Sequence, residues 1–114
     1  DDYILLKTLI KEAFGDQVSL DWYQKDGVAT DMICSGIYRL TLVDYQFGLE
    51  NGLEVIRQAK AACPNQVVFM VTSWVAMVDR ETALAAGADG FLNKNELSVN
   101  MVRSEFAPYL NLSV

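Results

Sequence analysis

The chain has 114 residues, of which 52% are hydrophobic and 21% are charged, a balance typical of one globular domain with a sizeable core. The formal net charge is −6 and histidine is absent, so we expect no direct contact with nucleic acid and no imidazole in a catalytic or metal site. Carboxylates, hydroxyls and lysine must therefore carry any chemistry.

Hydrophobic periodicity in the first part of the chain predicts helices and strands in alternation. Apolar residues recur in pairs every four positions from Leu5 to Phe14, which predicts a helix that ends near Gly15. The segment "VSLDWY" (18–23) alternates and stops at a Lys-Asp-Gly turn, as a strand does. We expect a short helix over 28–34, followed by a strand buried on both faces at "RLTLV" (39–43).

The second part continues the same alternation. A helix over 52–62 is broken by a Cys-Pro-Asn sequence, and "VVFMVT" (67–72) follows as a fully buried strand. We expect the remaining elements to be a helix that stops at a glycine, a short strand and a final helix, over 79–88, 90–93 and 96–110. Strands that alternate with helices of about ten residues predict an α/β fold, with a parallel sheet covered on both faces.

The two cysteines, Cys34 and Cys63, form neither a CxxC pair nor a dense framework. We therefore expect two buried thiols and a cytoplasmic, reducing setting. The sequence shows no basic-then-apolar leader and no apolar run long enough to span a bilayer. It therefore indicates neither export nor membrane insertion.

Polar residues gather where the predicted strands end and where the first helix begins. In a sheet of this kind, ligands bind beyond the carboxyl ends of the strands, where strand order reverses. Clustered carboxylates there favour a cation such as Mg²⁺, and a carboxylate beside Mg²⁺ and an ammonium can attack a phosphoryl group. The pattern therefore predicts the chemistry of an aspartyl phosphate. The residues concerned are Asp1, Asp2, Asp44, Thr72, Ser73, Asn93 and Lys94.

Four segments resemble the receiver domain of two-component response regulators: "DDYILLKTLI", "LTLVDYQFGLENGLEVI", "VFMVTSW" and "AAGADGFLNKNEL". The resemblance implies a flavodoxin-like, doubly wound parallel sheet with strand order 2-1-3-4-5. The family's first strand should precede Asp1, so we expect it to be missing from this chain. Residues 1–114 are then expected to be one receiver domain, incomplete at its N-terminus and part of a longer protein.

The resemblance also implies roles for individual acidic residues. Asp44 would be the phosphoacceptor. Asp1 and Asp2 would hold Mg²⁺ together with Asp44, with Asp2 as the direct ligand of the pair. Gln46, two positions beyond the acceptor, would supply a backbone carbonyl to the same ion.

Three further residues would respond to the phosphoryl group. Thr72 would be the hydroxyl that shifts to meet it, and Lys94 the cation that senses it. Phe91 would be the aromatic switch that turns inward when Thr72 moves. The resemblance implies that this repacks the fourth helix, fifth strand and fifth helix, here roughly 74–86, 90–93 and 96–110.

The same resemblance implies the partners. A sensor histidine kinase or a phosphotransfer protein would donate the phosphoryl group, and the repacked face would contact an effector or a second copy of the chain. The domain would not be an enzyme in the usual sense, since it promotes only its own phosphotransfer and autodephosphorylation. Bulky Trp74 and Gln46 would tune the lifetime of the phosphoryl group, because attacking water must pass them.

Departures from the family keep two other interpretations open. Asn95 stands where the family usually follows its lysine with proline, so we expect a trans peptide bond there, and Gly48 replaces the proline four residues beyond the acceptor. One alternative is a pseudo-receiver that binds partners without phosphorylation. The other is a flavodoxin-like domain that binds a nucleotide or flavin, which the acidic residues and the lack of a G-x-G-x-x-G motif disfavour.

Taken singly, each of these residues also has an ordinary structural explanation. Asp1 and Asp2 would serve as helix caps, and Asp44 would open a turn. Lys94 alone would be a solvated loop charge. The coincidence of suitable groups at several strand ends is what favours a functional site.

Overall fold

In this computed structural model, residues 2–18, 29–44, 46–47, 50–72 and 80–110 are described. Three parallel strands form the central layer in the order β1-β4-β5, with bounds Thr41–Asp44, Val68–Thr72 and Gly90–Asn93. The register sets Asp44 beside Val71 and Thr72 beside Asn93. The carboxyl ends of all three strands therefore meet at one edge of the sheet, which confirms the expected parallel arrangement.

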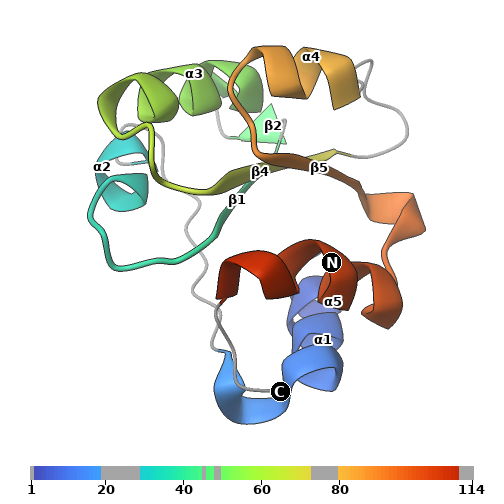
Figure 1. Ribbon diagram of the computed structural model, residues 1–114. Coiled ribbons are helices and arrows are strands. Elements are labelled where there is room, and N and C mark those ends of the chain that lie inside the picture. Colours follow the sequence, from blue (N-terminus) through green and yellow to red (C-terminus); the bar gives the residue numbers. More distant parts are fainter. Residues whose placement is uncertain (1, 19–28, 45, 48–49, 73–79, 111–114) are drawn as a thin grey trace.

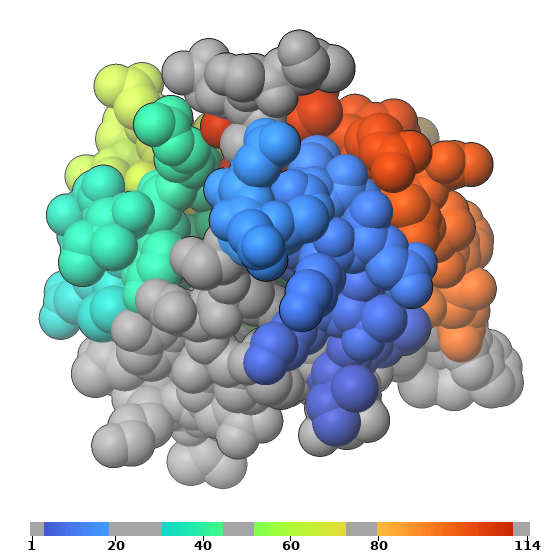
Figure 2. Space-filling model, turned by 90° about the horizontal axis from the view of Figure 1, so that it is seen from below, coloured from blue at the N-terminus to red at the C-terminus, as the bar shows by residue number. Residues whose placement is uncertain are grey.

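Helices cover both faces of the sheet (Figure 1). On one face lie α3 (Gly52–Ala62) and α4 (Arg80–Ala85), with the short α2 (Ala29–Ile33) beside α3. On the other face lie α1 (Asp2–Phe14) and α5 (Val99–Leu110), which pack against each other. Figure 2 shows this second face, with blue α1 beside the orange-red residues of α5.

Helices α1 and α3 stop where the sequence predicts, whereas α4 ends at Ala85, three residues before its predicted end. Helix α1 ends at a 3₁₀ turn, η1 (Gly15–Gln17), and Gly15 there has a φ of +63°. Gly87 follows α4 with a φ of +111°, a left-handed conformation that favours glycine. Helix α5 begins three residues later than predicted, because a 3₁₀ turn, η2 (Lys94–Glu96), precedes it. Ser98 then caps α5 by accepting a hydrogen bond from the Met101 amide at 3.1 Å.

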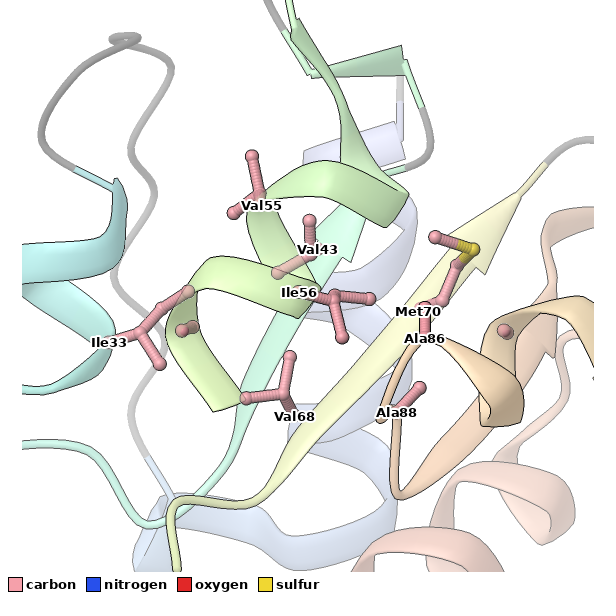
Figure 3. Packing of buried hydrophobic residues seen from close by; sticks show 10 residues of the cluster. Ile33, Val43, Val55, Ile56, Val68, Met70, Ala86 and Ala88 are labelled. Atoms are coloured by element: carbon pink, nitrogen blue, oxygen red, sulfur yellow. The ribbon is translucent and has the colours of Figure 1, made fainter. Parts of the chain in front are cut away.

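Alternating strand residues build two separate hydrophobic clusters. Val68 and Met70 point toward α3 and α4, where they pack with Ile56 (Figure 3). Phe69 and Val71 join the cluster formed with α1 and α5 on the opposite face. Every residue of β4 is buried, because β4 lies between two strands and two helical layers.

Strand β1 differs from the prediction in its burial. Only Val43 of this strand is fully buried, whereas Thr41, Leu42 and Asp44 are partly exposed. The expected burial on both faces is therefore wrong for this strand. The reason is its position, because β1 is at the edge of the three-stranded sheet that the structure describes.

The two cysteines also contradict the prediction, because Cys34 and Cys63 form a disulfide rather than two free thiols. The pairing brings together residues 29 positions apart, since α2 packs against α3 and each cysteine directly follows one of these helices. Spacing along the sequence cannot reveal such a pairing. By loop-closure entropy, a disulfide of this span stabilises the fold by roughly 3 to 4 kcal/mol.

Sequence periodicity also missed a small antiparallel hairpin between β1 and α3. Its strands are β2 (Gln46–Phe47) and β3 (Glu50–Asn51). The predicted strand over 18–23 and its turn fall almost entirely outside the described residues, as does Gly48. The described residues contain no cis peptide bond, so the bond between Lys94 and Asn95 is trans, as expected. None of the helices described has the length and apolar character needed to cross a bilayer.

Candidate functional site at the carboxyl edge of the sheet

An ion pair joins the ends of two strands that are not neighbours. Asp44 is the last residue of β1, and Lys94 directly follows β5. The Lys94 Nζ atom donates a hydrogen bond to Asp44 Oδ2 at 2.6 Å, across 50 residues of sequence. The side chains are 15% exposed for Lys94 and 33% for Asp44, so the pair is shielded but still reachable from solvent. A charge-assisted hydrogen bond of this length fixes the lysine beside the carboxylate.

Thr72 ends the strand that lies between those two. It is 1% exposed and is the one buried polar residue found in the described part of the core. Its register partner is Asn93, the residue before Lys94, and its predecessor Val71 is the partner of Asp44. A carboxylate, a hydroxyl and an ammonium therefore lie at the carboxyl ends of three adjacent strands, as the sequence predicts.

Phe91 lies in β5 and is partly buried against the cluster of α3 and α4. Arg80, the first residue of α4, holds it in two ways. The Arg80 Nη2 atom donates to the Phe91 carbonyl oxygen at 3.3 Å, and the guanidinium carbon is 5.9 Å from the ring centroid. This cation–π contact ties the predicted aromatic switch to α4, and sequence reasoning missed it.

Beside Phe91, α4, β5 and α5 surround a shallow hollow of about 280 Å³. Its lining mixes one cation with amide, apolar and acidic side chains from these elements and from η2: Arg80, Phe91, Asn93, Glu96, Met101 and Glu105. These three elements are the ones that the sequence resemblance assigns to the output face.

The acidic residues at the start of the chain are described only in part. Asp1, Ser73 and Trp74 lie outside the described residues; Asp2 opens helix α1, and Gln46 opens β2. Within the described part of the chain, no group of three or more acidic, cysteine or histidine residues could hold a metal. The hard oxygens of Asp44 suit Mg²⁺, which binds few protein ligands and keeps several waters. Asp44 is therefore an oxygen donor of the kind that Mg²⁺ binds, and a Mg²⁺ site here would need further oxygen ligands beside it.

A second polar cluster lies at the opposite edge of the sheet. Asp89 Oδ2 accepts hydrogen bonds from Lys60 Nζ at 3.0 Å and from the Val68 amide at 2.8 Å. The same lysine donates to the Gln66 carbonyl oxygen at 2.7 Å. These contacts tie the start of β4 to α3 and to the turn before β5, so we assign this cluster a structural role.

Solved structures similar to this chain are receiver domains and response regulators at low identity. A CheY-like response regulator receiver domain protein from Methanospirillum hungatei is 20% identical, covers 97% of this chain and 89% of its own, and has a TM-score of 0.75. The receiver domain of a putative Luxo repressor from Vibrio parahaemolyticus is 18% identical over 95% and 80% of the two chains, with a TM-score of 0.76.

A third similar structure is a response regulator from Burkholderia pseudomallei, with a phosphorylated aspartic acid, a calcium ion and citrate. It is 19% identical, covers 95% of this chain and 68% of its own, and has a TM-score of 0.66. Among curated proteins no significant match is found. The family model described as the response regulator receiver domain matches residues 1–104. With that match and the shared α/β fold, the chain belongs to the response regulator receiver domain family.

Proposed function

We propose that this chain is a phosphoacceptor domain in which Asp44 receives a phosphoryl group from a histidine kinase or a phosphotransfer protein. The observation that carries the proposal is the 2.6 Å hydrogen bond from Lys94 to Asp44. It holds a cation next to a carboxylate that remains one-third exposed at the carboxyl edge of the sheet. That is the place where parallel α/β sheets bind ligands.

The reacting groups have distinct tasks. An Asp44 carboxylate oxygen attacks the phosphorus atom, forming an oxygen–phosphorus bond while the bond from phosphorus to the donor breaks. The Lys94 ammonium offsets negative charge on the phosphoryl oxygens, and the Thr72 hydroxyl donates a hydrogen bond to one of them. Burial of Thr72 excludes bulk water from its side of the group.

Mg²⁺ bound by Asp44, Asp2 and the Gln46 carbonyl, with Asp1 nearby, would supply further charge neutralisation. The chain's own residues still determine where the phosphoryl group binds. Lys94 reaches Asp44 from the end of β5, and the Asp44 side chain stays one-third exposed, so we propose that the donor and the metal approach it from solvent.

The signal would leave the site through Phe91 and Arg80. A shift of Thr72 toward the phosphoryl group would change the space next to β5, where Phe91 lies. Arg80 contacts link Phe91 to α4, so a movement of Phe91 would reach that helix. Movement of Phe91 therefore alters the hollow between α4, β5 and α5. We propose that this surface meets an effector or a second copy of the chain, as a population shift between two arrangements.

Intact-mass analysis tests the proposal directly. The chain is incubated with acetyl phosphate with and without Mg²⁺, beside the variants Asp44→Ala and Asp16→Ala. We expect one phosphoryl adduct that requires Mg²⁺ and Asp44. Asp16 is an exposed residue of η1, so we expect Asp16→Ala to form the same adduct as the chain without substitutions.

The outcomes distinguish this proposal from its alternative. An adduct that persists in Asp44→Ala would assign the modification to another residue and refute the role of Asp44. Absence of any adduct from a folded sample would favour a pseudo-receiver that binds partners without phosphorylation.

A further inference from the structure

Cys34 and Cys63 are groups capable of thiol–disulfide exchange that the proposed function does not use. They form a disulfide, with 5.7 Å between their Cα atoms. Cys34 directly follows α2 and Cys63 directly follows α3, and both residues are partly exposed. The bond is therefore not fully enclosed in the core, and we expect a small thiol or disulfide in solution to reach it.

The disulfide fastens a short element that buries few of its described side chains. Helix α2 has five residues, too few to be stable as an isolated helix. Its buried anchor is Ile33, which is 3% exposed and points toward α3 (Figure 3). Among the side chains of α2 that the structure describes (31–33), one is fully buried, and the disulfide lies next to it in sequence.

A reduced form is also compatible with the fold. Both sulfur atoms lie near the same backbone oxygen, that of Ala59, at 3.0 Å for Cys63 and 3.7 Å for Cys34. In the reduced chain, a thiol hydrogen could be donated to this carbonyl oxygen without rearrangement of α3. After reduction, the Ala59 carbonyl oxygen could therefore accept a hydrogen bond from the Cys34 or the Cys63 thiol.

We propose that Cys34 and Cys63 form a reversible oxidation site, whose disulfide docks α2 on α3 and whose reduction lets α2 detach. The oxidant is a low-molecular-weight disulfide. A thiolate of the pair attacks one of its sulfurs and expels a thiol, and the second cysteine then displaces the other thiol from the mixed disulfide. The protein gives up two electrons and two protons, and the small disulfide becomes two thiols.

The disulfide and the proposed phosphorylation site lie toward opposite ends of strand β1. Val67, four residues after Cys63, accepts a hydrogen bond from the Thr41 amide at 3.0 Å, at the amino end of β1. Asp44 closes the carboxyl end of the same strand. Redox state should therefore change the docking of α2 and the stability of the domain, whether or not Asp44 is phosphorylated.

Exchange is expected to be slow. Each cysteine follows the carboxyl end of a helix, where the helix dipole does not favour a thiolate. Reactive cysteines more often lie at helix amino termini or beside cations. Redox equilibrium should accordingly need hours rather than seconds, which sets the incubation time of the test.

The test equilibrates the full chain in buffers of reduced and oxidised glutathione at several ratios. Remaining thiols are trapped by alkylation, and the disulfide fraction is read from the intact mass. We expect one two-electron transition that reverses when the ratio is reversed. Reduction should lower the Tm by roughly 10 to 15 °C, given the length of the loop that the bond closes. Amides of residues 31–35 should exchange hydrogen at least about tenfold faster.

The double variant Cys34→Ser with Cys63→Ser is the matched control. Its Tm and exchange rates should not respond to glutathione and should resemble those of the reduced chain. Two free thiols in every buffer, or a Tm response no larger than in the variant, would overturn the proposal. If α2 amides in the reduced chain exchange as slowly as those of β4, both exchange only through global unfolding, and the claim that α2 detaches by itself would be overturned.

Discussion

The hydrogen bond between Lys94 and Asp44 is shielded enough to affect stability as well as chemistry. Its side chains are 15% and 33% exposed, whereas those of the Arg57–Glu54 pair on α3 are 55% and 50% exposed. Exposed ion pairs contribute little because water screens them and side-chain entropy opposes them. Comparing the two pairs therefore tests how much shielding from water increases the contribution of an ion pair to the free energy of unfolding.

We expect Lys94→Met to lower the free energy of unfolding by about 1 kcal/mol, since it leaves Asp44 without its lysine partner. Arg57→Met should change it by less than about 0.5 kcal/mol. Urea unfolding of both variants measures the difference. Equal effects of the two substitutions would mean that the Lys94 pair is solvated as fully as the surface pair.

Thr41, the first residue of β1, has a hydroxyl that no described residue satisfies. Its Oγ1 atom is buried and has no hydrogen-bond partner among the described residues. Burial of an unpaired hydroxyl costs free energy, and valine keeps the branched shape while removing that atom. We expect Thr41→Val to raise the free energy of unfolding by about 1 kcal/mol.

Chemical denaturation checks this expectation, with Thr8→Val on the exposed side of α1 as the control. The control should be nearly neutral, since both residues are β-branched and position 8 is exposed. A loss of stability in Thr41→Val would show that the hydroxyl has a partner after all.

At the scale of elements, the contact of β4 with β5 depends on a glycine. Gly90 pairs with Phe69, and a Cβ atom added at Gly90 would lie 2.5 Å from a carbon of the Phe69 ring. That ring is also packed edge-on against Phe106 and Tyr109, with centroids 5.6 Å and 5.5 Å away. The ring therefore has little freedom to move aside.

We expect Gly90→Ala to lower the free energy of unfolding by about 2 kcal/mol through overpacking. In the double variant with Phe69→Leu, the loss should be smaller than the sum of the two single losses, because the smaller side chain makes room. Denaturation of all four proteins completes the cycle. Additive losses would contradict a direct clash between position 90 and the ring.

The same elements show which features the sequence could predict. Helix α3 and strand β4 follow the prediction closely because each has a long apolar pattern with a clear stop. The hairpin of β2 and β3 has two residues per strand, too few to show any period. The start of α5 was misplaced because η2 precedes it and Ser98 supplies the cap.

The candidate site was predictable where it depends on strand ends alone. Asp44, Thr72 and Lys94 meet because parallel strands bring their carboxyl ends to one edge. Contacts that depend on how helices pack were not predictable. These include the Arg80 contact with Phe91 and the disulfide, since neither follows from spacing along the chain.

At the scale of the whole molecule, one sheet serves two cores. Ile56 on α3 belongs to the cluster with α2 and α4, and Phe106 on α5 to the cluster with α1. Neither side chain is more than 2% exposed. Strand β4 contributes alternate residues to both clusters, so loss of either cluster exposes the same strand.

We therefore expect Ile56→Ala and Phe106→Ala each to lower the free energy of unfolding by about 3 to 4 kcal/mol, through lost burial and the cavity left behind. Each variant should still unfold in one transition, with coincident far-UV and near-UV circular dichroism curves. Leu84→Ala on α4, at a residue 44% exposed, should cost less than about 1 kcal/mol. Two separate transitions in either core variant would mean that the faces unfold independently and that β4 does not couple them.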